Sequence, residues 1–431
     1  KSELIETKLK TPLSGLKAKL AGLKPAKDFA AALKVAGLQI IAEVKNKWNT
    51  VKGSNKNSNY DDLKFVLKGE LKGWTTAKDV AFELLRRLKV HGGLGWIIEF
   101  SGSGLGKLTV PQRASIANMV TEVGATAALF PSDKMTKTFL NWQGRGKCFK
   151  AFSADADALY DREIEIDISS LEPMAAVPHS PDNIIKVRRL KGVGISQSLI
   201  GSCGNSSYED IATAAAILKG KKIARGVSFG VIPGTRQVLE MASKSGALAG
   251  LVAAGARVLE SACGACIGMG QAPASGTASV RTFNRNFEGR SGTKDAGIYL
   301  AGVPVAAASA LAGEITGPAN PGKRTKIKLP AKAFVDDSMV LAPSKNPDSV
   351  KIIRGPNIKP LPRFGATENS IEGKVLLKLG DHVTTDDILP AGAKILPLRS
   401  NIPAISEFAF SRMDASFASR AKEAGAGVVV G

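Results

Sequence analysis

Two cysteines at a C-x-x-C spacing are the residues of this sequence whose chemistry is most distinctive. Cys263 and Cys266 lie in the segment ESACGACIGMG, and the chain has only four cysteines. A pair at this spacing is typical of a disulfide, a redox pair, half of a zinc site or part of an iron–sulfur cluster. The spacing alone does not choose among these four kinds of site.

The rest of the chain weakens three of these interpretations. A chain of 431 residues that is 44% apolar can bury several cores without disulfides. Zinc would normally require a second cysteine or histidine pair, and none of His91, His179 and His382 lies near a cysteine in sequence. Small residues surround both thiols, which disfavours an exposed redox thiol.

A third cysteine, Cys203, lies where a strand is expected to give way to a helix. In SLIGSCGNSSYEDIATAAAILKG we expect a buried strand to end at Gly201 and a helix to begin near Ser206, with Ser206 and Glu209 as a capping box. The backbone N–H groups and the positive helix end at such a turn stabilise a thiolate. Three cysteines can bind three irons of a four-iron cluster and leave the fourth open to an oxygen ligand.

Four segments, in this order, resemble the aconitase family, and its shorter bacterial-type branch most closely. They are IGSCGNSSYEDI, CGACIGMGQAP, RTFNRNFEGRSGTKDAGIYL and GDHVTTDDILPAGAKILPLRSNIPAISEF, and the resemblance covers roughly residues 71–431. It implies that Cys203, Cys263 and Cys266 are ligands of a [4Fe-4S] cluster. It also implies descent from a hydro-lyase that interconverts citrate and isocitrate, with the open iron binding the substrate.

The resemblance further implies residues that bind the substrate. They are Asn284, Arg285 and Arg290 in NRNFEGR, and Arg399 in LPLRSNIP. Arginine forks bind carboxylates through two parallel hydrogen bonds, which suits a tricarboxylate. Without the resemblance, Arg285 and Arg290 would be expected to pair with surface acids, and Arg399 would be an ordinary loop arginine.

Other residues give weaker signals. Glu122 and Asp386 match family acids and are the remaining catalytic candidates, although such carboxylates are more often solvated or paired with a neighbour. Cys148 matches no family ligand, and we expect it to be a packing residue.

The pattern of elements predicts an α/β fold with aconitase-like parallel or mixed sheets covered by helices. Helices are expected over 76–90, with Thr76 and Asp79 as a capping box, and over 109–125, with Thr109 as the N-cap. The strand-like runs GVSFGVI and ARVLES alternate with helical TRQVLEMASKSGA. Because the cysteines follow strands, we expect them at the carboxyl ends of a parallel sheet, where ligands bind.

We divide the chain into five parts. They are a Lys-rich segment that is a remnant of a first domain (1–70), an α/β domain (71–184), an α/β domain with the cluster cysteines (185–318), a linker (319–350) and a partial, separate C-terminal swivel-type domain (351–431). The linker assignment rests on the Pro-, Gly- and Lys-rich stretch 317–332, which lacks acids.

Several family motifs have no counterpart in this sequence. The resemblance would lead us to expect an Asp-His pair and an Asp-Ser-His-Thr motif near the start and a Ser-Ser-Arg-Glu motif near the end. Smaller departures are Gly204 for threonine, Ala265 for proline and Asp387 for histidine. These differences favour a family member that has lost catalysis.

The charge of the chain favours the same interpretation. The formal net charge is +21, and residues 1–72 hold fifteen lysines, seven acids and no arginine. Such an excess suits an anionic partner, whereas a tricarboxylate needs only a few arginines. We therefore predict a non-catalytic structural subunit of a large RNA-containing assembly such as an organellar ribosome. The alternative is an active aconitate hydratase that binds a [4Fe-4S] cluster and a tricarboxylate.

The expected location follows from these hypotheses. No run of eighteen apolar residues is present, so we expect a soluble protein without a transmembrane helix. We expect the mitochondrial matrix, or the cytoplasm if the chain is bacterial.

Overall fold

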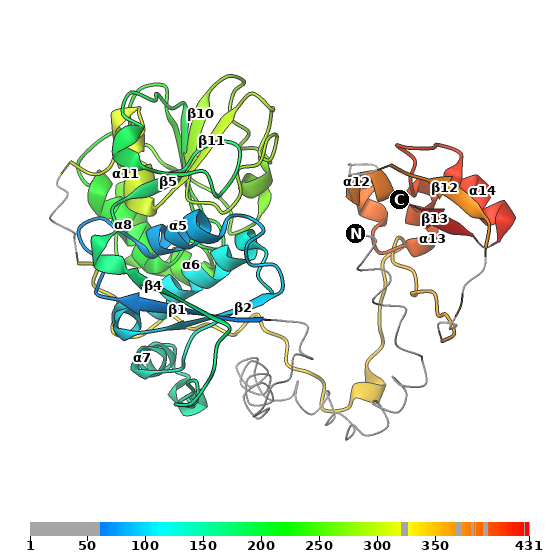
Figure 1. Ribbon diagram of the computed structural model, residues 1–431, viewed down its shortest axis with the longest axis horizontal. Coiled ribbons are helices and arrows are strands. Elements are labelled where there is room, and N and C mark those ends of the chain that lie inside the picture. The colour runs from blue at the N-terminus through cyan, green and yellow to red at the C-terminus, as the bar shows by residue number, and fades with distance from the viewer. Residues whose placement is uncertain are drawn as a thin grey trace. The chain divides into compact units, whose positions relative to one another are not determined.

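The computed structural model describes residues 61–319, 326–366, 370, 373–380, 383, 385–390, 395–425 and 427–430. The described residues form two compact units, one that ends at Asp337 and one that begins at Ser338 (Figure 1). The first unit contains both large sheets. We describe each unit by itself.

A four-stranded parallel sheet begins the described part of the first unit. Its strands are β1 (Asp61–Lys68), β2 (Trp96–Ser101), β3 (Ala127–Leu129) and β4 (Arg162–Asp167), in the order β3-β2-β1-β4. Alternate residues of β1, namely Leu63, Phe65 and Leu67, are buried, as expected for a strand with one face on a core. β1 thus lies within the segment 1–70 that we had set apart by composition.

Two helices lie between this sheet and a second, larger one (Figure 1). They are α5 (Ala77–Leu88) and α6 (Val110–Val120). Side chains of β1, α5 and α6 share one core with Leu199 and Leu300 of the larger sheet. Because α5 is covered on both sides, even its polar residues Lys78 and Asp79 are buried.

The larger sheet has seven strands in the order β6-β5-β11-β10-β7-β8-β9. They are β5 (Met174–Ala176), β6 (Ile184–Lys186), β7 (Gln197–Ile200), β8 (Ser228–Val231), β9 (Arg257–Val258), β10 (Ala278–Arg281) and β11 (Gly297–Ala301). The strands from β11 to β9 pair in parallel, whereas β5 pairs antiparallel with both of its neighbours. The sheet is therefore mixed, with a parallel centre.

Helices of the larger sheet build a second core on its other face. These are α8 (Tyr208–Leu218), α9 (Arg236–Lys244), α10 (Ala247–Ala254) and α11 (Val303–Ala312). Small residues allow close packing, and Ala306, Ala307 and Ala310 of α11 are fully buried there. The helix α7 (Lys134–Trp142) lies at the far end of the unit, near the four-stranded sheet (Figure 1).

The second unit is small. It contains a two-stranded parallel sheet of β12 (Val375–Lys378) and β13 (Val428–Val430), with the helices α12 (Thr385–Ile388), α13 (Ile402–Ile405) and α14 (Phe417–Ala424). Phe410 and Phe417 meet edge to face, with ring centroids 4.9 Å apart.

The structure confirms the predicted fold class, an α/β fold with parallel and mixed sheets covered by helices. The N-caps Thr76 and Thr109 are also confirmed, each in a capping box. The capping box of α8 was predicted one residue too early. Ser207 is the N-cap and pairs with Asp210, because Ser207 has the extended backbone that the position requires. The division into five parts stays a prediction.

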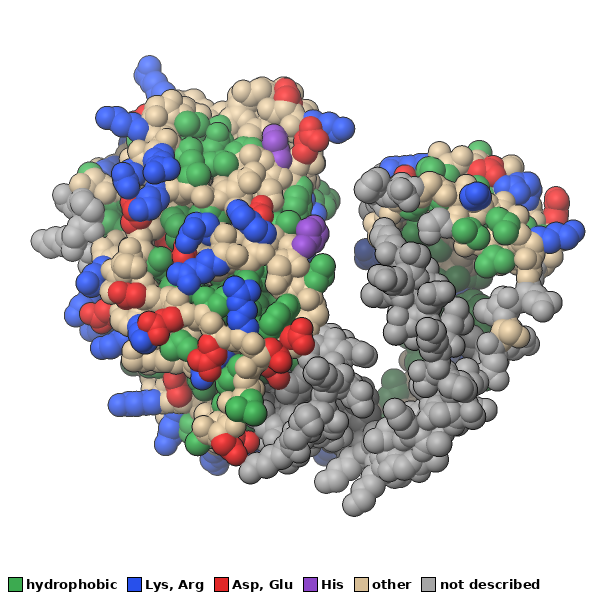
Figure 2. Space-filling model, viewed as in Figure 1, with side chains coloured by type: hydrophobic (Ala, Val, Ile, Leu, Met, Phe, Trp, Pro, Cys, Tyr) green, Lys and Arg blue, Asp and Glu red, His purple; other side chains and the backbone are tan. Residues whose placement is uncertain are grey.

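The length of the helices and the charges on the surface bear on what the chain could bind. Within the part of the chain that the structure describes, no helix is long and apolar enough to cross a bilayer. Basic and acidic side chains are interspersed on the face of the first unit shown in Figure 2.

Asp79 generates a prediction about stability. Its carboxylate accepts hydrogen bonds from the Thr76 N–H at 2.7 Å and the Met174 N–H at 2.7 Å, so it caps α5 and joins it to β5. Asp79→Ala should lower the free energy of unfolding by about 2–4 kcal/mol, because it removes a cap and leaves a buried donor unpaired. Urea titrations followed by tryptophan fluorescence will measure this change, since all four tryptophans precede residue 338. Asp155→Ala, at an exposed position, should change it by less than about 0.5 kcal/mol.

The same residue predicts a dependence on pH. Burial raises the pKa of Asp79 to about 6, so folding takes up a proton here between about pH 4 and 6. The stability that Asp79 contributes is then greatest below about pH 4 and falls as the pH rises to about 6. The difference in the free energy of unfolding between wild type and Asp79→Ala should become smaller as the pH rises from about 4 to 6. A difference that grows over this range would contradict the raised pKa of Asp79.

Candidate active site at the carboxyl ends of the parallel strands

A cavity of about 400 Å³ opens at the carboxyl ends of the parallel strands of the larger sheet. Residues that follow β7, β8, β9 and β10 line it, as the sequence predicted for the cysteines. The predicted site residues among its lining are Glu122, Cys203, Cys263, Cys266, Asn284, Arg285 and Arg290. Residues up to 168 positions apart in the chain thus share one cavity.

A strained turn presents Cys203. Gly201 has φ +150°, and a Cβ there would lie 2.5 Å from the Ile232 Cβ, so no larger residue fits. The next residue, Ser202, has φ +71°, which is unfavourable for a side chain other than glycine or asparagine. Its Oγ lies 3.4 Å from the Cys266 Sγ and 3.7 Å from the Cys203 Sγ. The turn therefore brings a hydroxyl between two of the cysteines.

The C-x-x-C segment forms a short 3-10 helix, Gly264–Ile267. It ends at Gly268, with φ +81°, where a Cβ would lie 2.1 Å from the Ser291 carbonyl oxygen. The fully buried Arg281, at the end of β10, donates to the Ala265 carbonyl oxygen at 3.1 Å and to the Gln271 carbonyl oxygen at 2.8 Å. Arg281 thus fastens the loop of both cysteines to the sheet.

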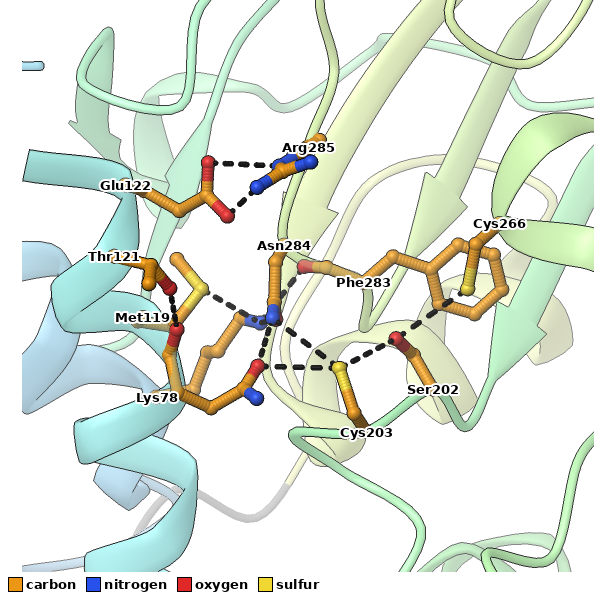
Figure 3. A network of polar contacts seen from close by, with 11 residues as sticks. Lys78, Met119, Thr121, Glu122, Ser202, Cys203, Cys266, Phe283, Asn284 and Arg285 are labelled. Carbon is orange, nitrogen blue, oxygen red and sulfur yellow. Dashed lines mark hydrogen bonds and ion pairs between the residues drawn. The ribbon is translucent and has the colours of Figure 1, made fainter. Parts of the chain in front are cut away.

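A polar network connects α5, α6 and the loop after β10 (Figure 3). The fully buried Lys78 donates from Nζ to the Phe283 carbonyl oxygen at 2.7 Å and to the Asn284 Oδ1 at 3.1 Å. Asn284 Nδ2 donates to Asn118 Oδ1 and lies 3.6 Å from the Cys203 Sγ. Burial lowers the pKa of Lys78 to about 8, and Cys203 is the group that opposes this shift most strongly.

Glu122 and Arg285 form an ion pair at the cavity (Figure 3). Arg285 Nε donates to both carboxylate oxygens, at 3.0 and 3.1 Å. Glu122 lies in the 3-10 turn Thr121–Val123 that follows α6, and its side chain is only 6% exposed. Burial raises the pKa of Glu122, and Arg285 opposes that rise. A carboxyl with a raised pKa in a cavity is a candidate for proton transfer.

Arg290 lines the same cavity and has an unsatisfied donor. Its Nε is buried without a hydrogen-bond partner in the structure. Buried donors are rarely left unpaired, so an acceptor is expected there. A carboxylate matches a guanidinium in shape and charge.

The cysteines suit a cluster better than a single metal ion. Among the described residues, no three His, Cys, Asp or Glu side chains lie close enough to hold one ion. A four-iron cluster binds each cysteine through a different iron, so its ligands need not converge on one point. Cys203 and Cys263 are exposed at the cavity, and both act electrostatically on Cys266. The donor set therefore fits a cluster with three cysteine ligands.

Two predicted site residues belong to the second unit, so their part in this site stays a prediction. Arg399 is exposed and belongs to the second unit, as does Asp386, whose side chain lies outside the described residues. Sequence reasoning missed Lys78, Asn118 and Ser202. Lys78 and Asn118 lie on helices whose sequence patterns indicate a helix but no site. Ser202 is adjacent to Cys203 in the predicted turn, and this position was a signal that it could belong to the site.

The exposure of the thiols predicts an order of alkylation. Burial raises the pKa of Cys266, which is half-buried, while Cys148, Cys203 and Cys263 are exposed. The prediction that Cys148 is a packing residue is therefore wrong. Iodoacetamide reacts with the thiolate, so in metal-free protein Cys266 should be labelled last at neutral pH. Peptide mass spectrometry over time will measure the four rates, and labelling of Cys266 ahead of Cys148 would contradict this geometry.

Comparison with known proteins gives a consistent result. The model of the aconitase family (aconitate hydratase) matches residues 50–192 and 186–313. The 3-isopropylmalate dehydratase large subunit of Clostridium botulinum (strain Alaska E43 / Type E3) is 42% identical over 258 residues, which make up 59% of this chain and 61% of that protein. The figures are the same for the large subunit of Clostridium beijerinckii. Large subunit 2 of Archaeoglobus fulgidus is 40% identical over 259 residues, 60% of this chain and 62% of that protein.

These findings bear on the two functional hypotheses. The chain spans 61–62% of the length of these curated relatives. The relatives carry the names of dehydratase subunits, which favours the hydratase alternative over the non-catalytic subunit that we placed first. No finding supports an RNA partner or a ribosomal role, and the location stays a prediction. The resemblance to the aconitase family is confirmed, and the chain belongs to that family.

Proposed function

We propose that this chain is the cluster-binding part of a hydro-lyase that reversibly removes water from a hydroxydicarboxylate, with 3-isopropylmalate as the first candidate. One observation carries the proposal: three cysteines, two arginines and a buried carboxyl line a single cavity. The names of the matched relatives supply the candidate substrate. Citrate, the substrate that the resemblance implied, is the comparison to test.

The three cysteines would hold a [4Fe-4S] cluster. When bound, such a cluster supplies a Lewis acid, through an iron without a cysteine ligand, for the hydroxyl group that leaves. The thiolates of Cys203, Cys263 and Cys266 are the ligands that the cavity offers. Asn284, whose amide already lies 3.6 Å from the Cys203 Sγ, would donate to that sulfur.

The arginines would bind and orient the substrate. Arg290 has a buried donor that awaits an acceptor, and a substrate carboxylate would satisfy it. Arg285 is held in place by Glu122, so its guanidinium is positioned before the substrate arrives. Two guanidinium groups at one cavity match a substrate with two carboxylates.

Glu122 would donate a proton to the substrate or accept one from it. Its carboxyl is buried at the cavity, and its raised pKa favours the protonated form more than in water. A carboxyl of this kind can donate a hydrogen bond to a hydroxyl group or accept one from it. The pairing with Arg285 fixes its orientation.

Anaerobic reconstitution with iron and sulfide tests the proposal. The reconstituted chain should bind iron and sulfide and convert 3-isopropylmalate to its unsaturated product, followed by the ultraviolet absorbance of the new double bond. Cys263→Ser should lose iron and turnover, whereas Cys148→Ser, at an exposed cysteine outside the cavity, should keep both. A wild-type chain that binds no iron, or equal turnover by Cys263→Ser, would overturn the proposal.

The arginine geometry generates a second test. Arg290→Lys keeps the charge but loses the fork, so kcat/KM should fall by about 100-fold. Arg188→Lys is the matched control, because Arg188 is an exposed arginine paired with Glu172 and should leave kcat/KM unchanged. Steady-state kinetics with 3-isopropylmalate and with citrate will also show which substrate depends on Arg290. An unchanged kcat/KM for Arg290→Lys would remove Arg290 from the binding site.

A further inference from the structure

Two fully buried cations flank the cysteines without a carboxylate partner. Lys78 and Arg281 both have 0% of their surface exposed. Neither forms an ion pair with any carboxylate in the described ranges. A buried charge is costly unless an opposite charge compensates it. The two buried positive charges therefore require a negative charge from another source.

Neutral groups satisfy the hydrogen bonds of Lys78 but not its charge. Its Nζ donates to the carbonyl oxygens of Thr282 and Phe283, at 3.1 and 2.7 Å, and to the Asn284 Oδ1. A sulfur atom, the Met119 Sδ, lies 3.5 Å away. All of these partners are uncharged, so none of them supplies a negative charge to the Lys78 ammonium.

Arg281 has the same kind of environment. Its guanidinium donates to the Gln197 Oε1 at 2.8 Å, to the Ser279 Oγ at 3.0 Å, and to the carbonyl oxygens of Ala265 and Gln271. Every acceptor is neutral. Ala265 lies between Cys263 and Cys266 in the sequence, so the guanidinium is bound to the loop that carries both thiols.

The nearby buried acids form no ion pair with Lys78, although Glu122, Asp210 and Asp79 lie close enough to act on its charge. Asp79 is engaged by Thr76 and Met174, and Asp210 caps α8 through Ser207. Glu122 is bound to Arg285. None of these carboxylates is in contact with the Lys78 ammonium.

Arg113 is another buried cation of the chain, and its partners can be compared with those of Arg281. It is 4% exposed and donates to the carbonyl oxygens of Leu105, Leu108 and Pro131, much as Arg281 does to its acceptors. Unlike Arg281, it also pairs with a carboxylate, that of Asp133, at 2.6 Å. Of the buried cations in the described ranges, Lys78 and Arg281 are thus the two without a carboxylate partner.

We propose that Lys78 and Arg281 are positioning residues whose missing counter-charge is the anionic cluster held by Cys203, Cys263 and Cys266. The inference rests on the proposed function, since it requires a cluster on these cysteines. Three thiolates and their iron–sulfur core together carry net negative charge. The two cations attract that charge from two sides, Lys78 through the loop after β10 and Arg281 through the C-x-x-C loop. They therefore hold the cluster and make its reduction easier.

Neutral variants test this role through the cluster itself. Lys78→Met and Arg281→Gln should each shift the reduction potential of the reconstituted cluster to more negative values, measured by a titration monitored by electron paramagnetic resonance. Each should also speed the loss of iron to a chelator by about tenfold. Arg281→Lys keeps the charge, so its potential should stay near that of the wild type.

The matched control is Arg113→Gln, because Arg113 is a buried cation whose partners lie outside the loops that carry the cysteines. It should lower thermal stability and leave the reduction potential unchanged. An equal shift in Arg113→Gln, or no shift in the neutral variants, would overturn the inference. If one neutral variant does not fold, the other decides.

The same experiment separates this inference from the proposed function. A wild-type chain that loads with iron and sulfide, together with neutral variants that keep its potential and its rate of iron loss, contradicts the inference alone. A wild-type chain that takes up no iron and sulfide contradicts both.

Discussion

The parallel pairing of β7 with β10 is the constraint on which the site depends. It places two loops side by side, one with Cys203 and one with Asn284 and Arg285. Thr282 joins the loops, since its Oγ1 accepts from the Gly201 N–H at 2.8 Å and donates to the Gly201 carbonyl oxygen at 3.0 Å. The neighbouring strands β8 and β9 end at the same edge, and β9 leads into the C-x-x-C segment. The cavity is therefore a consequence of strand direction.

Local signals in the sequence predicted much of this arrangement. The capping boxes at Thr76 and Thr109 depend on residues three positions apart, so they could be identified from the chain alone. The position of the cysteines after strands followed from the alternation of strand-like and helical segments. The family resemblance then indicated that Cys203, Cys263 and Cys266 share one site with Arg285 and Arg290.

Other features could not be predicted because they depend on distant contacts. Lys78 looks like a surface lysine of an amphipathic helix, and only the position of α5 between two sheets buries it. Its partners Thr282 and Phe283 lie more than 200 residues away. The ion pair of Glu122 with Arg285 likewise joins a turn after α6 to a loop after β10. Net charge bears on solubility and partners rather than on the chemistry of a site, so it could not decide between the two functional hypotheses.

The proposed function requires that one iron of a cluster on these three cysteines is open to substrate. Mössbauer spectroscopy of the iron-loaded chain, with and without 3-isopropylmalate, tests it most directly, because each iron environment gives its own signal. We expect a four-iron cluster in which the substrate alters the signal of a single iron. A spectrum that the substrate leaves unchanged, or one without a four-iron cluster, would contradict it.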